Sequence, residues 1–126
     1  MSKNTSNKQP SALADIFSHP EFKAAASIHS QVGDSGYTRI ITAFLNGIKE
    51  ELNRLESLEI MRQEEKRQLF HKVAGAASAV GAAKLEAISR SMEAEILNHP
   101  TISTEPLTLE IKTTIALLEK HLVAVS

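Results

Sequence analysis

A single histidine lies in a stretch of small and aliphatic residues at positions 69–93. His71 is followed by the glycines Gly75 and Gly81, by many alanines, and by Glu93, which stands 22 positions after the histidine. An imidazole is neutral near pH 7, so it can act as a nucleophile without first losing a proton. His71 is therefore the residue of this stretch best suited to covalent chemistry, such as the acceptance of a phosphoryl group.

The helical pattern around His71 predicts that its ring faces solvent. At about 100° per residue, the apolar residues cluster on one face of the helix, and they are Phe70, Val73, Ala77 and Val80. His71 falls roughly opposite the middle of that face, and Gly75 and Ser78 share its side. Glycine in a helix interior costs about 1 kcal/mol relative to alanine. Gly75 therefore indicates a position that another surface approaches closely.

Composition and charge exclude several classes of function. The chain has 126 residues, enough for one domain, and its formal net charge of -1 gives no electrostatic footprint for nucleic acid. It has no cysteine, which excludes disulfides and thiolate metal sites, and its 4% aromatic content argues against a β-sandwich. No apolar run approaches the ~20 residues that span a bilayer, and no secretory signal pattern is visible. A soluble cytoplasmic protein is expected.

The apolar periodicity predicts an all-α fold, namely an up-down antiparallel four-helix bundle with one or two short extra N-terminal helices. Residues 1–10 are polar and are expected to form a disordered tail, whereas residues 11–126 are expected to form the helical domain. Breakers and caps then predict the boundaries. Short helices are expected at 11–17 and 20–30, a turn at 32–36 with Asp34 or Ser35 as cap, and long helices at 37–58, 62–80, 82–98 and from the cap Thr104 to Val125.

The residues after His71 resemble the signature of histidine phosphotransfer (HPt) domains. The matching string is HKVAGAASAVG, from His71 to Gly81, with Leu85 and Glu93 following. The family pattern is histidine, any residue, a hydrophobic residue, lysine, glycine and two small residues, then a glycine, a leucine and a terminal acidic or amide residue. The match covers residues 69–93 directly, and the expected bundle extends it over most of the chain.

The resemblance implies a role for several side chains. His71 is implied to accept a phosphoryl group from the aspartate of a receiver domain and to pass it to another receiver. Glu93, on the following helix, is implied to hydrogen-bond the ring and orient the imidazole, and a carboxylate there would fix the tautomer. Gly75 is implied to clear space for the docking receiver. No cofactor is expected on this chain, because the Mg²⁺ used in transfer belongs to the receiver.

One position departs from the family pattern. The family has a lysine three residues after the histidine, beside the phosphoryl group, where this chain has Ala74. Arg67, one turn before His71, is the first candidate to supply that positive charge instead. The residues expected to form the receiver-docking surface and the phosphate surroundings are Arg67, Gln68, Lys72, Ala74, Gly75, Ser78 and Arg90.

Three functions remain open from the sequence. The first is a phosphorelay intermediate without independent turnover, whose partners are response-regulator receiver domains and a hybrid sensor histidine kinase. The second is a transfer-deficient HPt-like module that binds receivers as a decoy or scaffold, and Ala74 motivates it. The third is a plain helix-bundle subunit, which a buried His71 would favour. Neither nucleic acid nor a membrane is expected as a partner, a monomer is expected, and the initiating methionine and polar N-terminus favour a free protein.

Several of these residues also have ordinary structural explanations. Glu93 can be a surface carboxylate, and Arg67, Lys72 and Arg90 can be solvated charges. The remaining histidines show no ligand spacing with one another or with carboxylates, so they are expected at surface or boundary positions: His19, His29, His99 and His121.

Overall fold

The structure is a computed structural model that describes residues 16–57 and 60–125. Within this part of the chain the regular elements are helices, and no strand is present. The prediction of an all-α fold is therefore confirmed. The tail expected at 1–10 and most of the short helix expected at 11–17 lie outside the described residues.

A short N-terminal segment leads into the first long helix. Pro20–Phe22 form the 3₁₀ helix η2, and helix α2 follows at Ala25–Leu55. Helix α2 has one break, at Gly33, whose φ of 76° and ψ of 178° are not helical. A positive φ is readily adopted only by glycine, so the chain changes direction at this residue. The turn predicted at 32–36 is thus reduced to a kink at Gly33, and the helix predicted at 20–30 is divided between η2 and α2.

Helix α3, which carries His71, begins and ends where the sequence predicted. It spans Gln63–Val80 and is followed by Gly81 in the left-handed conformation, with φ 80°. At its start, the backbone N–H of Arg62 donates to Glu65 Oε1 at 2.8 Å. This hydrogen bond lowers the pKa of Glu65, as expected for a carboxylate in the first turn of a helix.

The last two helices follow the prediction closely. Helix α4 spans Ala83–Glu95 and ends earlier than predicted, because residues 96–98 continue as turns. Helix α5 spans Glu105–Val125. Its first backbone hydrogen bond runs from Thr108 N–H to the carbonyl of Thr104 at 3.0 Å, which is the bond that an N-cap residue accepts.

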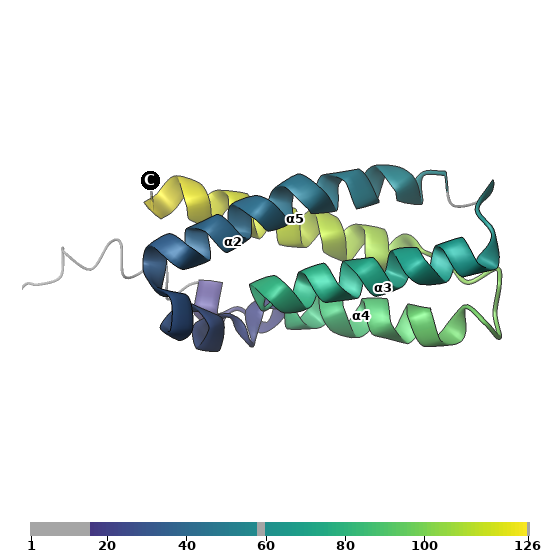
Figure 1. The fold of residues 1–126 in the computed structure, drawn as a ribbon, viewed down its shortest axis with the longest axis horizontal. Helices are drawn as coiled ribbons and strands as arrows, with labels where there is room; N and C mark the ends of the chain where they lie inside the picture. Colours follow the sequence, from purple (N-terminus) through teal and green to yellow (C-terminus); the bar gives the residue numbers. More distant parts are fainter. Residues whose placement is uncertain (1–15, 58–59, 126) are drawn as a thin grey trace, which may run out of the picture.

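The long helices pack side by side around one core. Helix α3 packs against α4 and α2, helix α5 packs against α4 and α2, and η2 packs against α4. Figure 1 shows these helices running along the long axis of the molecule, with the N-terminal segment near the α3–α4 turn. The largest fully buried side chains come from every one of these elements: Tyr37, Phe22, Phe70, Ile41, Ile48, Leu69, Leu85, Ile96, Leu107, Ile111, Leu118 and Val73.

Two close contacts hold the C-terminal end of α3. The Tyr37 hydroxyl donates to the carbonyl of Val80 at 2.8 Å, and burial raises the pKa of Tyr37. Gly81 lies directly against the start of α2, because a Cβ at this residue would stand 2.6 Å from backbone atoms of Ala25. We call residues 80–84, η2 and Ala25 the turn region. Its tight packing holds the C-terminal end of α3, the helix that carries His71, against the start of α2.

Candidate functional site

His71 and Glu93 meet across the two most closely associated helices. His71 Nδ1 of α3 lies 2.8 Å from Glu93 Oε2 of α4. The His71 side chain is 66% exposed, whereas the Glu93 side chain is 20% exposed. Because an ionised carboxylate only accepts hydrogen bonds, Nδ1 is the donor in this pair. The lone pair of the neutral ring is then on Nε2, the nitrogen opposite the one that Glu93 holds.

Arg67 joins this pair to a second carboxylate. Its Nη1 lies 3.5 Å from Glu93 Oε2, the oxygen that also accepts from His71. On its other side, Arg67 donates to both oxygens of Glu64, through Nε at 3.0 Å and Nη2 at 2.6 Å. Gln68 donates to Glu64 as well, at 3.3 Å. The four side chains His71, Glu93, Arg67 and Glu64 thus form a continuous series of polar contacts, which we call the His71 network.

The charges of this network stabilise one another. The hydrogen bond from Arg67 lowers the pKa of Glu64, and Glu64 in turn raises the pKa of Arg67. Both residues therefore keep their charges through the neutral pH range. A carboxylate, a guanidinium and a second carboxylate accordingly stand beside a solvent-exposed imidazole.

Lys72 and Arg90, the other two cations predicted at the site, bind carboxylates outside the His71 network. Lys72 Nζ lies 2.9 Å from Glu51 Oε2, a carboxylate of α2 whose side chain is only 4% exposed. Arg90 Nε donates to Glu86 Oε2 on its own helix at 3.0 Å. In the structure, Arg67 is therefore the predicted cation whose contacts lead to His71.

The surface near His71 contains the small residues that the sequence placed there. Gly75 and Ser78 are exposed, and nothing lies within 4 Å of the position that a Cβ would take at Gly75. The expectation that Ala74 contributes to this surface is wrong, because Ala74 is fully buried. Ala74 lies about 60° around the helix from His71, on the side of Phe70 and Ala77, which are buried as well.

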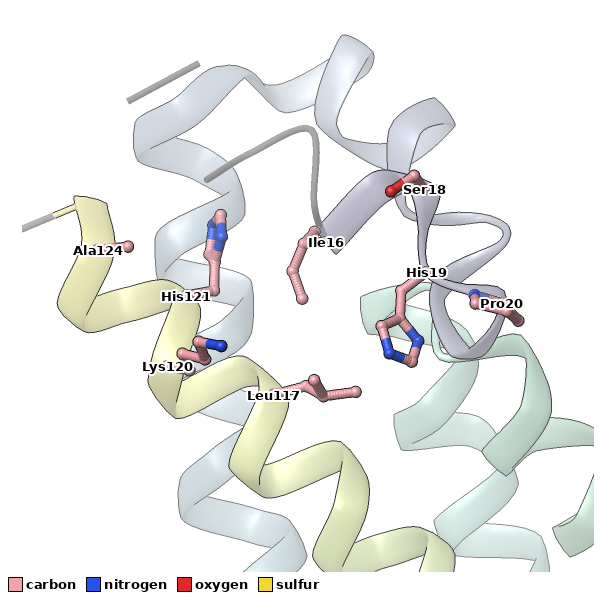
Figure 2. Close-up of a pocket in the computed structure, with 8 residues that line it drawn as sticks. All are labelled: Ile16, Ser18, His19, Pro20, Leu117, Lys120, His121 and Ala124. Carbon is pink, nitrogen blue, oxygen red and sulfur yellow. The ribbon is translucent and has the colours of Figure 1, made fainter. Parts of the chain in front are cut away.

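A cavity of about 450 Å³ lies elsewhere, between the N-terminal segment and the end of α5. Figure 2 shows Ile16 and His19 on one side of it and Leu117 and His121 on the other. His71 is not among its lining residues, so this cavity is separate from the His71 network. His121 is 5% exposed, which corrects the expectation of a surface or boundary position for this residue. It follows the buried side of α5, where its ring packs near Tyr37.

Sequence reasoning missed two carboxylates at or beside the site. Glu64 binds Arg67 and Gln68, and its signal was the spacing of three and four residues that places such side chains together on a helix. Glu51 binds Lys72, and its signal was its place between Ile48 and Leu55 in the apolar stripe of α2. A charged residue in such a stripe calls for a partner, and here it is Lys72.

Comparisons with protein-family models, with curated proteins and with solved structures find no match to this chain. Among the described residues, no helix is sufficiently long and apolar to cross a membrane. The function is therefore inferred from the geometry of the site and from the resemblance of the motif.

Proposed function

We propose that this protein is a histidine phosphotransfer domain that works as a phosphorelay intermediate. His71 accepts a phosphoryl group from the aspartate of one response-regulator receiver and passes it to another. The observation that carries the proposal is the 2.8 Å contact from Glu93 to Nδ1 of a ring that is 66% exposed. One nitrogen is oriented by the protein, and the other nitrogen carries the lone pair that a nucleophile requires.

In the proposed transfer, one bond to phosphorus forms as another breaks, and His71 and Glu93 are the groups that this protein supplies. Nε2 attacks the phosphorus atom and forms the P–N bond, while the bond from phosphorus to the aspartyl oxygen breaks and the aspartate leaves as a carboxylate. The ring then carries a positive charge with the proton still on Nδ1, directly opposite the Glu93 carboxylate. Transfer to the next receiver reverses these steps. The Mg²⁺ that stabilises the phosphoryl group during transfer belongs to the receiver in this proposal.

The proposal includes the arrangement and partners that such a domain would have. The four long helices form an up-down antiparallel bundle, and the receiver docks on the face that carries His71, Gly75 and Ser78. Open space over Gly75 supports this choice of face, because a flat surface lets another protein come close to Nε2. A hybrid sensor histidine kinase supplies the phosphoryl group through its receiver, and the protein acts in the cytoplasm as a monomer without turnover of its own.

A second candidate function is a receiver-binding module that has lost transfer. The observation that favours it is Ala74, which stands where the HPt pattern has lysine and is fully buried. An alanine at this position supplies no ammonium group that could neutralise a phosphoryl group on His71. Transfer would then depend on Arg67 alone, and a loss of that function would leave a scaffold that binds receivers.

Transfer of radiolabelled phosphate from a panel of phosphorylated receivers distinguishes the two candidates. The phosphocarrier predicts acid-labile, base-stable label on the wild-type protein and its loss, by at least about a hundredfold, in His71→Gln. His99→Gln is the matched control, because His99 is an exposed histidine outside the His71 network. Label retained by His71→Gln would refute the proposal. Receiver binding without any label on the wild type would favour the scaffold.

A further inference from the structure

Two hydrogen-bond donors lie close to the same oxygen, Glu93 Oε2. His71 Nδ1 lies 2.8 Å away and Arg67 Nη1 lies 3.5 Å away, so the ring has the closer contact. A guanidinium is a strong donor to carboxylates and carries a full positive charge, whereas a neutral imidazole carries none. On chemistry alone, Arg67 would be the preferred partner of Glu93.

Glu64 accounts for why the arginine does not take that place. It accepts two hydrogen bonds from Arg67, at 3.0 and 2.6 Å, in the bidentate arrangement that a guanidinium favours. Glu64 sits on the same helix one turn before Arg67, so the bond holds the arginine back along α3 from Glu93. The geometry thus separates one tight arginine–carboxylate pair from one tight histidine–carboxylate pair.

We propose that Glu64 is a positioning residue that acts through Arg67: by binding the guanidinium, it leaves the Glu93 carboxylate available to hold the proton of His71 on Nδ1. The function of this arrangement rests on the proposed phosphotransfer at His71. Without Glu64, Arg67 would move onto Glu93 Oε2, and the ring would lose part of the interaction that keeps its lone pair on Nε2. The reactive tautomer would then be less populated, and phosphorylation would slow in proportion.

The ¹⁵N chemical shifts of the His71 ring test this proposal directly, because they report the ratio of Nδ1–H to Nε2–H in the neutral imidazole. At an alkaline pH where imidazole is uncharged, Glu64→Gln is expected to lower that ratio about twofold, the size typical of an exposed ion pair. Arg67→Gln is expected to raise it by a similar factor, because the guanidinium then no longer competes with the ring for Glu93.

The double variant Glu64→Gln/Arg67→Gln decides the mechanism. If Glu64 acts through Arg67, the double variant keeps the raised ratio of Arg67→Gln, because no arginine remains for Glu64 to hold. If Glu64 acts directly on the ring by its charge, the two effects add and the double variant returns to the wild-type ratio. That result, or an unchanged ratio in Glu64→Gln, overturns the proposal. Glu86→Gln is the matched control, since it breaks the comparable pair with Arg90 on α4.

Chemical phosphorylation by phosphoramidate gives a second readout without a receiver. The P–N bond of the reagent breaks, ammonia leaves, and the phosphoryl group forms a bond to Nε2. The initial rate is expected to follow the tautomer ratio across the four proteins, and a rate independent of that ratio would contradict the link to reactivity. Neither readout uses a receiver. A network that behaves as expected in a protein that no receiver labels would therefore refute the phosphorelay function and not the role of Glu64.

Discussion

Two glycines, one on the exposed face of α3 and one directly after its end, stand in opposite surroundings. On the exposed face, Gly75 lies beside His71 and has open space where a Cβ would be. In the turn region, Gly81 has φ 80° and lies against the backbone of Ala25. The HPt pattern contains both glycines, yet the structure gives them different tasks. Gly75 leaves open space on an exposed face, whereas Gly81 lets two parts of the same chain pack closely.

The charged groups of the two regions differ in the same way. In the His71 network, contacts of 2.6–3.0 Å form the Arg67–Glu64 and His71–Glu93 pairs, and a contact of 3.5 Å from Arg67 to Glu93 joins the two pairs. In the turn region, Lys84 Nζ lies 3.6 Å from Glu21 Oε2 and 3.6 Å from Oε1 of the neighbouring Glu110, which is 6% exposed. These contacts link α4, α5 and η2 through Lys84, whose side chain is 54% exposed, and its two carboxylate partners are largely buried. The two clusters therefore use similar residue types, but one surrounds an exposed imidazole and the other surrounds a buried carboxylate.

Alanine at each glycine gives the largest expected contrast between the regions. Gly81→Ala should lower the free energy of unfolding by about 3 kcal/mol or more, since it adds left-handed strain to a Cβ clash with Ala25. Gly75→Ala should raise it by about 0.5–1 kcal/mol, because it places a better helix former in open space. Urea unfolding of both variants measures the difference.

A bulky residue at position 75 separates folding from docking. Gly75→Gln should leave the unfolding free energy within about 1 kcal/mol of wild type, while it obstructs receiver docking on the exposed face. Receiver labelling should fall, and labelling by phosphoramidate should persist because that reagent is small. If Gly75→Gln unfolds the protein, the open space over Gly75 is not present in solution.

Lys72 and His71 are adjacent in the sequence, but they bind carboxylates of different helices: Lys72 binds Glu51 of α2, and His71 binds Glu93 of α4. Removal of its ammonium in Lys72→Met leaves the Glu51 carboxylate buried, with Arg54 3.7 Å away as the remaining cation. The free energy of unfolding should fall by about 1–2 kcal/mol, less than for a fully buried pair because Lys72 itself is largely exposed. Phosphoramidate labelling of the adjacent His71 should be unchanged.

The matched control for Lys72→Met is Arg90→Gln, which breaks an exposed pair within α4. It should change the unfolding free energy by less than about 0.5 kcal/mol. Equal losses in the two variants would mean that Glu51 is hydrated in solution. Slower labelling of His71 in Lys72→Met alone would place Lys72 in the phosphate surroundings after all.

The sequence predicted the parts of this molecule that depend on local chemistry. The end of α3 follows from Gly81, and the exposure of His71 follows from helical periodicity. Helical periodicity could not predict how much of the circumference of a helix is buried, because that depends on how closely the neighbouring helices approach it. The surface position predicted for Ala74 is therefore wrong, and so is the surface or boundary position predicted for His121. The Lys72–Glu51 pair was missed for a similar reason, since it joins α3 to α2 and depends on their alignment.

The smallest expected effect concerns the buried carboxylate beside the turn region. Burial raises the pKa of Glu110, and Lys84 offsets this only in part. The folded protein then binds the Glu110 proton more tightly than the unfolded chain does. The free energy of unfolding should therefore fall as the pH rises from the ordinary value of 4.5 through the raised pKa of this group.

Glu110→Gln removes this dependence, so wild type should lose stability relative to the variant as the pH rises through that window. Urea unfolding between pH 4 and pH 8 measures the difference between the two proteins. Glu119→Gln on the same helix is the control, because Glu119 is exposed and pairs with Lys49 at 2.8 Å. A difference of the opposite sign would mean that Lys84 outweighs burial. The cluster beside the turn region would then be an ion pair like those of the exposed face, and the two regions would differ in packing alone.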